Sequence, residues 1–246
     1  MKNACTLLLC LAGLNTAFAQ KEASSFSLAS ELSEAISGGK SQFVRTFDDR
    51  FQNAPKGSPF LYDEWLPGTL TLFDSSRTGD SILFKFDTYQ NEVWIRKIGG
   101  DSIIPYSDYI RQIDLRHPDG RSWRFKKYPV SNGSNPIRFY QPVYEGARYV
   151  LIKDEHKVLV RANFVERGVY TTGLPYDRFE GTAIEYYLQV APDAPFQKII
   201  LKKRALTELA PAAQARALEA FCNKEKIGNL PSGEEAARLL EFMEKG

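Results

Sequence analysis

The chain of 246 residues carries 32 Lys and Arg against 30 Asp and Glu, a formal net charge of +2, and 43% of it is hydrophobic. This near-neutral balance gives no electrostatic reason to expect a nucleic-acid partner. The 2 His and 3 Cys follow no H-x-x-x-H or C-x-x-C spacing, so neither a metal site nor another cofactor is predicted.

The first 19 residues have the parts of a secretory signal peptide. Lys2 supplies a positive charge, a short apolar run follows, and residues 17–19 read Ala-Phe-Ala, an A-x-A cleavage site. The apolar run is shorter than the roughly 20 residues that span a bilayer, and no transmembrane segment is expected later. We therefore expect an exported protein that is periplasmic, associated with the cell envelope or extracellular. Cleavage would remove Cys5 and Cys10 and leave Cys222 without a partner for an intramolecular disulfide.

Residues 20–56 form a polar segment with one short helix, predicted around Leu28 to Ile36 from apolar residues spaced four apart. From residue 57 to 204 the pattern changes to short runs with period-2 alternation, which is typical of antiparallel strands. Turn-forming sequences separate the runs at 75–80, 88–91, 99–101, 117–120 and 154–157. An open sheet of roughly ten strands tends to curl or split, so we expect an antiparallel meander closed as a barrel-like or sandwich core.

Residues 205–246 are expected to form a helical hairpin packed on this β-domain. Pro211 suits a first helical turn, Gly228 ends the first helix, and Ser232 with Glu235 forms a capping box for the second. Their apolar stripes are too short to be stable alone. The predicted fold class is therefore mainly β, with a C-terminal two-helix hairpin and a short N-terminal helix.

Several stretches resemble an uncharacterised family of exported, signal-peptide-bearing proteins frequent in Bacteroidetes. They are the sequences GSPFLYDEWLPGTLTLFD, ILFKFDTYQNEVWIR, YYLQV and FQKIILKKRAL, followed by the paired terminal helices. The resemblance covers nearly all of the mature chain and implies export, a β-rich domain and a helical hairpin. The family has no assigned activity, so no site residue is carried over.

The sequence Gly-Asp-Ser-Ile resembles the nucleophile block of GDSL-type esterases, but it occurs twice, ending in Ile82 and in Ile103. A catalytic motif has no reason to be duplicated, and such a nucleophile needs a helix after its turn. Ser81 and Ser102 both open extended runs instead. His117, in the sequence Asp-Leu-Arg-His, imitates the catalytic base of that class but is predicted at the mouth of a hairpin turn.

Other motifs also have structural explanations. His156 is expected in a polar turn. The pairs Asp48–Asp49, Asp63–Glu64 and Asp154–Glu155 could supply glycosidase carboxylates, but neighbours on a strand point to opposite faces, so a catalytic pair would need members from different segments.

Two aromatic stretches leave a binding alternative open. In residues 121–128 we expect Trp123 and Phe125 to face the core and Arg124 and Lys126 to face water, where anionic glycans or lipid headgroups are possible partners. Residues 62–68 are expected to form an aromatic corner, with a sugar site as the alternative.

No catalytic, cofactor-binding or metal-binding residue is assigned from the sequence. The expected function is that of a soluble, non-enzymatic cell-envelope protein that binds an envelope protein, an apolar ligand such as a lipid, or a glycan through its β-domain. The alternative is a hydrolase that depends on Ser102 or on dispersed carboxylates.

Overall fold

The computed structural model describes residues 27–46, 55–130, 137–163, 165–167 and 170–245. The predicted signal peptide, with Cys5 and Cys10, lies outside these residues, as does the Asp48–Asp49 pair. Among the residues that are described, no helix has the length and apolar character needed to cross a membrane.

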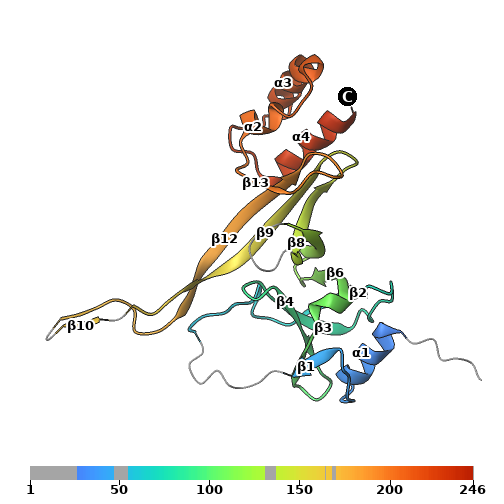
Figure 1. The fold of residues 1–246 in the computed structure, drawn as a ribbon, viewed down its shortest axis with the longest axis vertical. Coiled ribbons are helices and arrows are strands. Elements are labelled where there is room, and N and C mark those ends of the chain that lie inside the picture. Colours follow the sequence, from blue (N-terminus) through green and yellow to red (C-terminus); the bar gives the residue numbers. More distant parts are fainter. Residues whose placement is uncertain (1–26, 47–54, 131–136, 164, 168–169, 246) are drawn as a thin grey trace, which may run out of the picture.

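The described chain is mainly β, as predicted, with an antiparallel sheet of 11 strands, a separate two-stranded sheet and a few helices (Figure 1). The strands are β1 (Val44–Thr46), β2 (Leu66–Leu72), β3 (Ile82–Asp87), β4 (Glu92–Arg96), β5 (Ser102–Pro105), β6 (Ile110–Arg116), β7 (Ser122–Pro129), β8 (Ile137–Glu145), β9 (Val150–Val160), β10 (Val165–Arg167), β11 (Tyr170–Thr172), β12 (Arg178–Gln189) and β13 (Gln197–Ile199). The helices are α1 (Leu28–Ile36), α2 (Lys203–Thr207), α3 (Ala215–Lys224) and α4 (Gly233–Lys245), with short 3-10 turns at Ser107–Tyr109 and Ala212–Gln214.

The large sheet joins two meanders side by side. Its strand order is β1-β5-β4-β3-β2-β6-β7-β8-β9-β12-β13, so β2 to β5 form one meander, and β2 also pairs with β6, the first strand of the second. Every pairing is antiparallel. Whether this sheet closes as a barrel or a sandwich stays a prediction.

The turn between β3 and β4 docks on a distant strand. The Asn91 side chain donates from Nδ2 to the Phe139 carbonyl oxygen at 3.0 Å, and its Oδ1 accepts from the Phe139 N–H at 2.8 Å. Asn91 is buried and has a φ of 61°, a conformation that Asn tolerates better than most residues. Strands β2, β6 and β7 lie between β3 and β8, so the sheet must curl to allow this contact.

The first core lies on one face of β2 to β8 and is covered by α1. The helix has the predicted bounds, and it buries Leu32, Ala35 and Ile36 against the sheet. On β7, Phe125 is buried, Trp123 packs against the same core and Arg124 is exposed, as predicted, whereas Lys126, also expected to face water, is half-buried and lies 2.6 Å from Glu145 Oε2.

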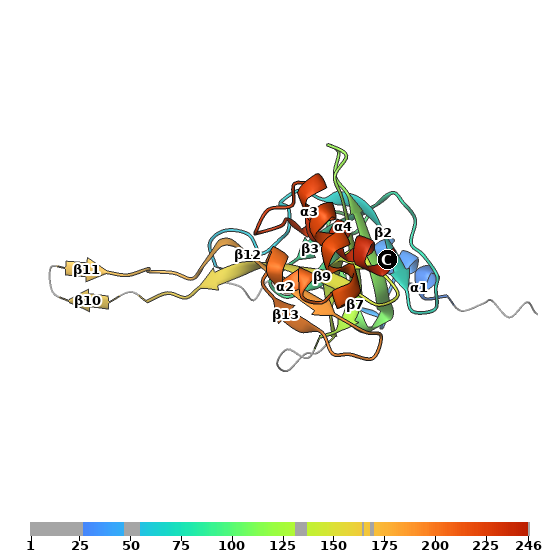
Figure 2. The same ribbon diagram turned by 90° about the horizontal axis from the view of Figure 1, so that it is seen from above.

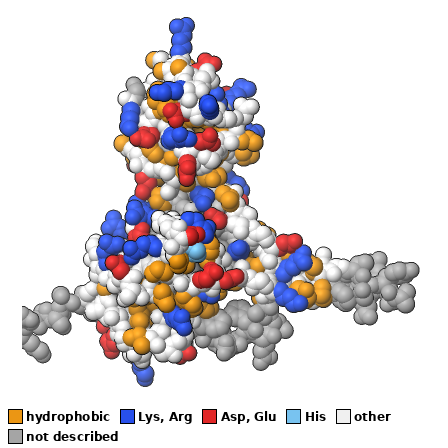
Figure 3. Space-filling view, turned by 180° about the vertical axis from the view of Figure 1, so that it is seen from behind, with side chains coloured by type: hydrophobic (Ala, Val, Ile, Leu, Met, Phe, Trp, Pro, Cys, Tyr) orange, Lys and Arg blue, Asp and Glu red, His pale blue; other side chains and the backbone are white. Residues whose placement is uncertain are grey.

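A separate core lies under the C-terminal helices, which are at the opposite end of the molecule from α1 (Figure 1). In the space-filling view an upper and a lower lobe are joined by a narrower waist (Figure 3). The helices cover Tyr149, Leu151 and Leu188, which come from β9 and β12 and the residue before β9. The next residues along, Ile152 and Tyr187, belong to a third, smaller cluster on the opposite face, because consecutive residues of a strand point to opposite sides.

The capping box of the last helix is confirmed. The Glu235 N–H donates to Ser232 Oγ at 3.2 Å, and the Ser232 N–H donates to Glu235 Oε2 at 2.7 Å. The preceding helix ends earlier than predicted, at Lys224, and Lys226 takes a φ of 55° before Gly228 is reached. The short helix α2 was not predicted; it adds Leu206 to the second core.

The prediction of a turn at residues 154–157 is wrong. These residues lie in the middle of β9, which pairs with β12 along a hairpin that continues into β10 and β11 and projects from the sheet as an arm (Figure 2). Here the polar run lies on the arm side of Leu151, the residue of β9 in the second core; Asp154 is buried and residues 155–157 are half-buried. The loss of apolar alternation at residues 154–157 therefore reflects a change in what surrounds the strand. The chain does not reverse direction there.

Candidate functional site

Both Gly-Asp-Ser-Ile sequences end a turn and begin a strand, as predicted. Strand β3 starts directly after Ser81, and β5 starts at Ser102. The second turn is closed by the Lys97 N–H, which donates to the Asp101 carbonyl at 2.8 Å, while Gly100 supplies a φ of 96°. A strand follows each serine where an esterase nucleophile needs a helix.

The structure does not bring Ser102 and His117 together. Strands β4, β3 and β2 lie between β5, which carries Ser102, and β6, after which His117 follows. The His117 ring is engaged within its own turn, where Nδ1 lies 2.8 Å from Asp119 Oδ1. Its predicted place at a hairpin mouth is confirmed, since β6 and β7 pair on either side of the turn.

A groove of about 680 Å³ lies where the first meander meets the base of the arm. Two edge-to-face aromatic pairs line it: Phe60 with Trp94, and Tyr89 with Phe179, each with ring centroids 5.3 Å apart. We call this site, defined by these four rings, the aromatic groove.

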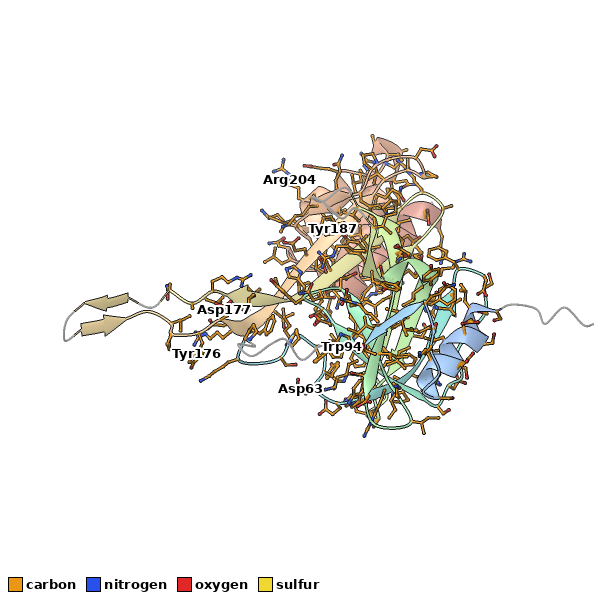
Figure 4. All side chains as sticks on the ribbon, turned by 60° about the horizontal axis from the view of Figure 1, so that its bottom comes forward. Asp63, Trp94, Tyr176, Asp177, Tyr187 and Arg204 are labelled. Carbon is orange, nitrogen blue, oxygen red and sulfur yellow. The ribbon has the colours of Figure 1, made fainter. Side chains whose placement is uncertain are left out.

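Backbone pairing positions the aromatic groove. The Lys56 N–H donates to the Asp177 carbonyl at 2.9 Å, and the Phe179 N–H donates to the Lys56 carbonyl at 2.8 Å, so the segment before β2 is held against β12. Lys56 Nζ also lies 3.6 Å from the centroid of the Tyr176 ring. Figure 4 shows Trp94 on the body of the sheet and Tyr176 and Asp177 at the base of the arm.

Charged groups complete the aromatic groove. The Arg45 guanidinium donates to the Glu92 carboxylate, and Arg161 Nη1 lies 2.7 Å from Asp177 Oδ2. Asp87, at the end of β3, is buried, and its Oδ1 accepts from the Gln90 N–H at 2.8 Å. Burial raises the pKa of Asp87 to about 6, and the nearby Glu92 carboxylate adds to this effect.

The second group of ionisable side chains lies on the hairpin of β9 and β12. Asp154 lies directly opposite Glu185 in the strand register, and His156 Nδ1 approaches Asp154 Oδ2 to 3.4 Å. Burial raises the pKa of Asp154, while hydrogen bonds from Lys198 and Tyr187 lower the pKa of Glu185. Neither carboxylate lines the aromatic groove.

Sequence reasoning paired Asp154 with its neighbour Glu155 and missed Glu185. That a catalytic pair would need members from different segments stays a prediction. Asp154 and Glu185 are two carboxylates from different strands that lie opposite each other, and identifying Glu185 required the register of a hairpin whose strands were predicted too short. Within the described residues, no three His, Cys, Asp or Glu side chains gather closely enough to hold a metal ion.

The aromatic groove was also missed as a unit. Its four rings come from the segment before β2, the β3–β4 turn, β4 and β12, and only the stretch at 62–68 was singled out from the sequence. There Tyr62 packs on Trp123 with ring centroids 4.7 Å apart, and Lys85 Nζ lies 5.4 Å from the centroid of the Trp65 ring, as expected of an aromatic corner.

Comparison of the chain with known protein families, with curated proteins and with solved structures found no match in any of the three.

Proposed function

We propose that this is an exported, non-enzymatic protein of the cell envelope, related to the Bacteroidetes family that its sequence resembles, and that it binds a glycan in the aromatic groove. The observation that carries the proposal is the presence of two aromatic pairs and two ion pairs around one groove. Small-molecule sites typically combine an aromatic lining with a few placed polar groups.

The chemistry of these groups suits a sugar better than an acyl chain. Trp94 and Phe179 are half-buried, so each packs into the protein and still leaves surface for contact with the C–H face of a sugar ring. The paired carboxylates and guanidinium groups at the rim can form further hydrogen bonds with sugar hydroxyl groups, whereas an acyl chain offers them no donor or acceptor.

Curling of the sheet supports the same site, and we propose that it amounts to a barrel-like closure. The bonds from Asn91 to Phe139 hold the β3–β4 turn against β8, and the Lys157 N–H donates to Thr88 Oγ1 in the same turn at 3.2 Å. This turn also carries Tyr89, so its docking places one aromatic wall of the groove next to β12.

A carboxylate-dependent hydrolase is the second candidate, favoured by Asp154 facing Glu185. Environments that push two carboxyl pKa values apart are typical of acid–base pairs. Glu185, however, is held by Lys198 Nζ and by the Tyr187 hydroxyl, both at 2.6 Å, and the Asp154 side chain is only 8% exposed. A Glu185→Gln variant that lost a hydrolytic activity of the wild type, with its melting temperature unchanged, would favour this alternative.

The binding proposal is tested by titrating the full chain with short neutral oligosaccharides in a calorimeter and confirming the complex by native mass spectrometry. We expect saturable binding that weakens about tenfold, or about 1.4 kcal/mol, in both Trp94→Ala and Phe179→Ala. Trp94→Phe keeps an aromatic face and should retain most of the affinity. The control is Phe73→Ala, because Phe73 is 55% exposed and lies outside the groove.

Two outcomes would contradict the proposal. Binding that is unchanged in both alanine variants would place the glycan elsewhere. Native spectra of protein recovered from its own envelope that show only a lipid or a protein partner would replace the glycan by that partner.

A further inference from the structure

A second cavity, of about 700 Å³, lies over β2, β6, β7 and β8 and shares no lining residue with the aromatic groove. Three arginines line it: Arg77 from the β2–β3 loop, Arg116 from the end of β6 and Arg124 from β7. We call it the arginine cavity, after these three residues.

Much of the hydrogen-bonding capacity of the three guanidinium groups is unused. Arg77 is exposed and has no ion-pair or hydrogen-bond partner for its side chain among the residues described. Arg124 engages Asp114 through Nε alone, at 2.7 Å, which leaves its two Nη groups for another acceptor. Arg116 Nη2 is 3.6 Å from Asp80 Oδ1, a contact too long for a good hydrogen bond.

The two carboxylates that line the cavity already have neutral partners. Asp80 Oδ1 accepts from the Thr69 hydroxyl at 2.7 Å, and Asp114 Oδ2 accepts from Gln112 Nε2 at 2.6 Å. Counting the ionised side chains of the lining, three guanidinium groups against two carboxylates leave an excess of positive charge.

A neutral donor adds to this set. Gln141 lines the cavity, and its Nε2 is buried without a hydrogen-bond partner in the described part of the chain. A buried donor without an acceptor is unfavourable, and a bound acceptor would relieve that cost. The cavity therefore presents amide and guanidinium donors in excess of its own acceptors.

We infer that the arginine cavity binds an oxyanion, the phosphate or sulfate group of a larger ligand. Guanidinium groups bind such tetrahedral anions through paired N–H donors, and charge-assisted hydrogen bonds of this kind are about twice as strong as neutral ones. The inference goes beyond the glycan proposal, because its site is separate and selects a charged group instead of a neutral sugar.

The test is a titration of the full chain at low ionic strength, first with inorganic phosphate and then with a phosphorylated monosaccharide. Binding is measured by NMR chemical shifts or by calorimetry. We expect saturable binding that weakens about tenfold in Arg77→Ala and in Arg124→Ala, the loss of one charge-assisted bond. Arg111→Ala is the matched control, since Arg111 is exposed on the same strand as Arg116 but does not line the cavity.

A variant that is expected to bind phosphate more tightly separates a loss of the binding site from a loss of folding. Asp80→Asn keeps an acceptor for the Thr69 hydroxyl and removes one negative charge from the cavity, so phosphate should bind several-fold more tightly. A gain in affinity cannot arise from partial unfolding.

Vesicles that contain phosphatidylglycerol distinguish two sources of the anion, a lipid headgroup and a soluble phosphate ester. Binding of vesicles that depends on Arg77 and Arg124 would identify a lipid headgroup, and binding of the soluble ester alone would identify a phosphorylated glycan or metabolite; both support the site. Absence of saturable phosphate binding, or an equal loss in Arg111→Ala, would overturn it.

Discussion

Ser81 is the last residue before β3 and Ser102 is the first residue of β5, and in the described part of the chain neither hydroxyl makes a hydrogen bond. We predict that Ser81→Ala and Ser102→Ala each change the free energy of unfolding by no more than about 1 kcal/mol, as expected of turn positions with few contacts. Urea denaturation measures this, and a fluorophosphonate probe should label neither the wild type nor the variants. Labelling that disappears only in Ser102→Ala would restore the esterase hypothesis.

Asp87 is a buried carboxyl group whose charged form is disfavoured by its surroundings in the fold. Its pKa is raised to about 6 by burial, above the ordinary value of 3.8, so the folded state holds a proton that the unfolded state has lost between these pH values. The resulting stability is fully present below about pH 4 and is lost as the pH rises through about 6.

We therefore predict that Asp87→Asn is more stable than the wild type at pH 7, by at most about 3 kcal/mol, and that this advantage shrinks towards pH 4. The asparagine keeps an acceptor for the Gln90 N–H, so the comparison isolates the charge. Urea denaturation of both proteins across this pH range provides the measurement. An advantage that is the same at both ends of the range would show that the carboxylate ionises in the fold without cost.

Among the elements, the turn between β3 and β4 depends on one side chain for its docking. Replacing Asn91 by Ala leaves the buried N–H and C=O of Phe139 without partners and places a methyl group at a φ of 61°. We predict a loss of roughly 2 kcal/mol or more in the free energy of unfolding.

Two further variants separate the causes of this loss. Asn91→Gly relieves the backbone conformation but not the missing bonds, and Asn91→Asp keeps only the acceptor for the Phe139 N–H. Both should remain clearly less stable than the wild type in thermal or urea denaturation. A glycine variant as stable as the wild type would mean that the bonds to Phe139 contribute nothing.

The elements that sequence reasoning located correctly are those determined by nearby residues. The helix Leu28–Ile36, the capping box at Ser232 and the turn at Gly100 each depend on contacts within a few positions. The long strand β9 was divided in two because polar residues within a strand resemble a turn when the surrounding surface is unknown. The aromatic groove was not predicted because Trp94 and Phe179 line one groove only after the hairpins are arranged in space.

At the scale of the whole molecule, two hydrophobic cores share no residue and lie at opposite ends of the sheet (Figure 1). The C-terminal helices are fixed to the strands by polar as well as apolar contacts. The Glu244 carboxylate accepts from the Tyr144 hydroxyl and from the N–H groups of Arg148 and Tyr149, and the Tyr149 hydroxyl donates to the Leu209 carbonyl at 3.2 Å. These contacts favour helices that cover the strands over an independently attached module.

Removing residues 205–246 should therefore make the protein aggregate or unfold. The truncation uncovers Tyr149, Leu151 and Leu188, all buried, and each such side chain contributes roughly 1.5 to 3 kcal/mol when it is buried. Light scattering and thermal denaturation of the truncated chain measure the outcome. A soluble truncated protein with an unchanged melting temperature would show that the helices form an independent module.

Point variants test the same covering role without deleting any chain. Leu240 is fully buried in the second core, and Leu240→Ala should lower the free energy of unfolding by about 2 to 5 kcal/mol. Leu230 is 72% exposed between α3 and α4, so Leu230→Ala should change it by less than about 0.5 kcal/mol. Because the helices cover β9 and β12, Leu240→Ala should also speed hydrogen exchange at Leu151 and Leu188 more than at Phe84 in the first core. Equal acceleration at all three amides would show instead that the two cores unfold as one unit.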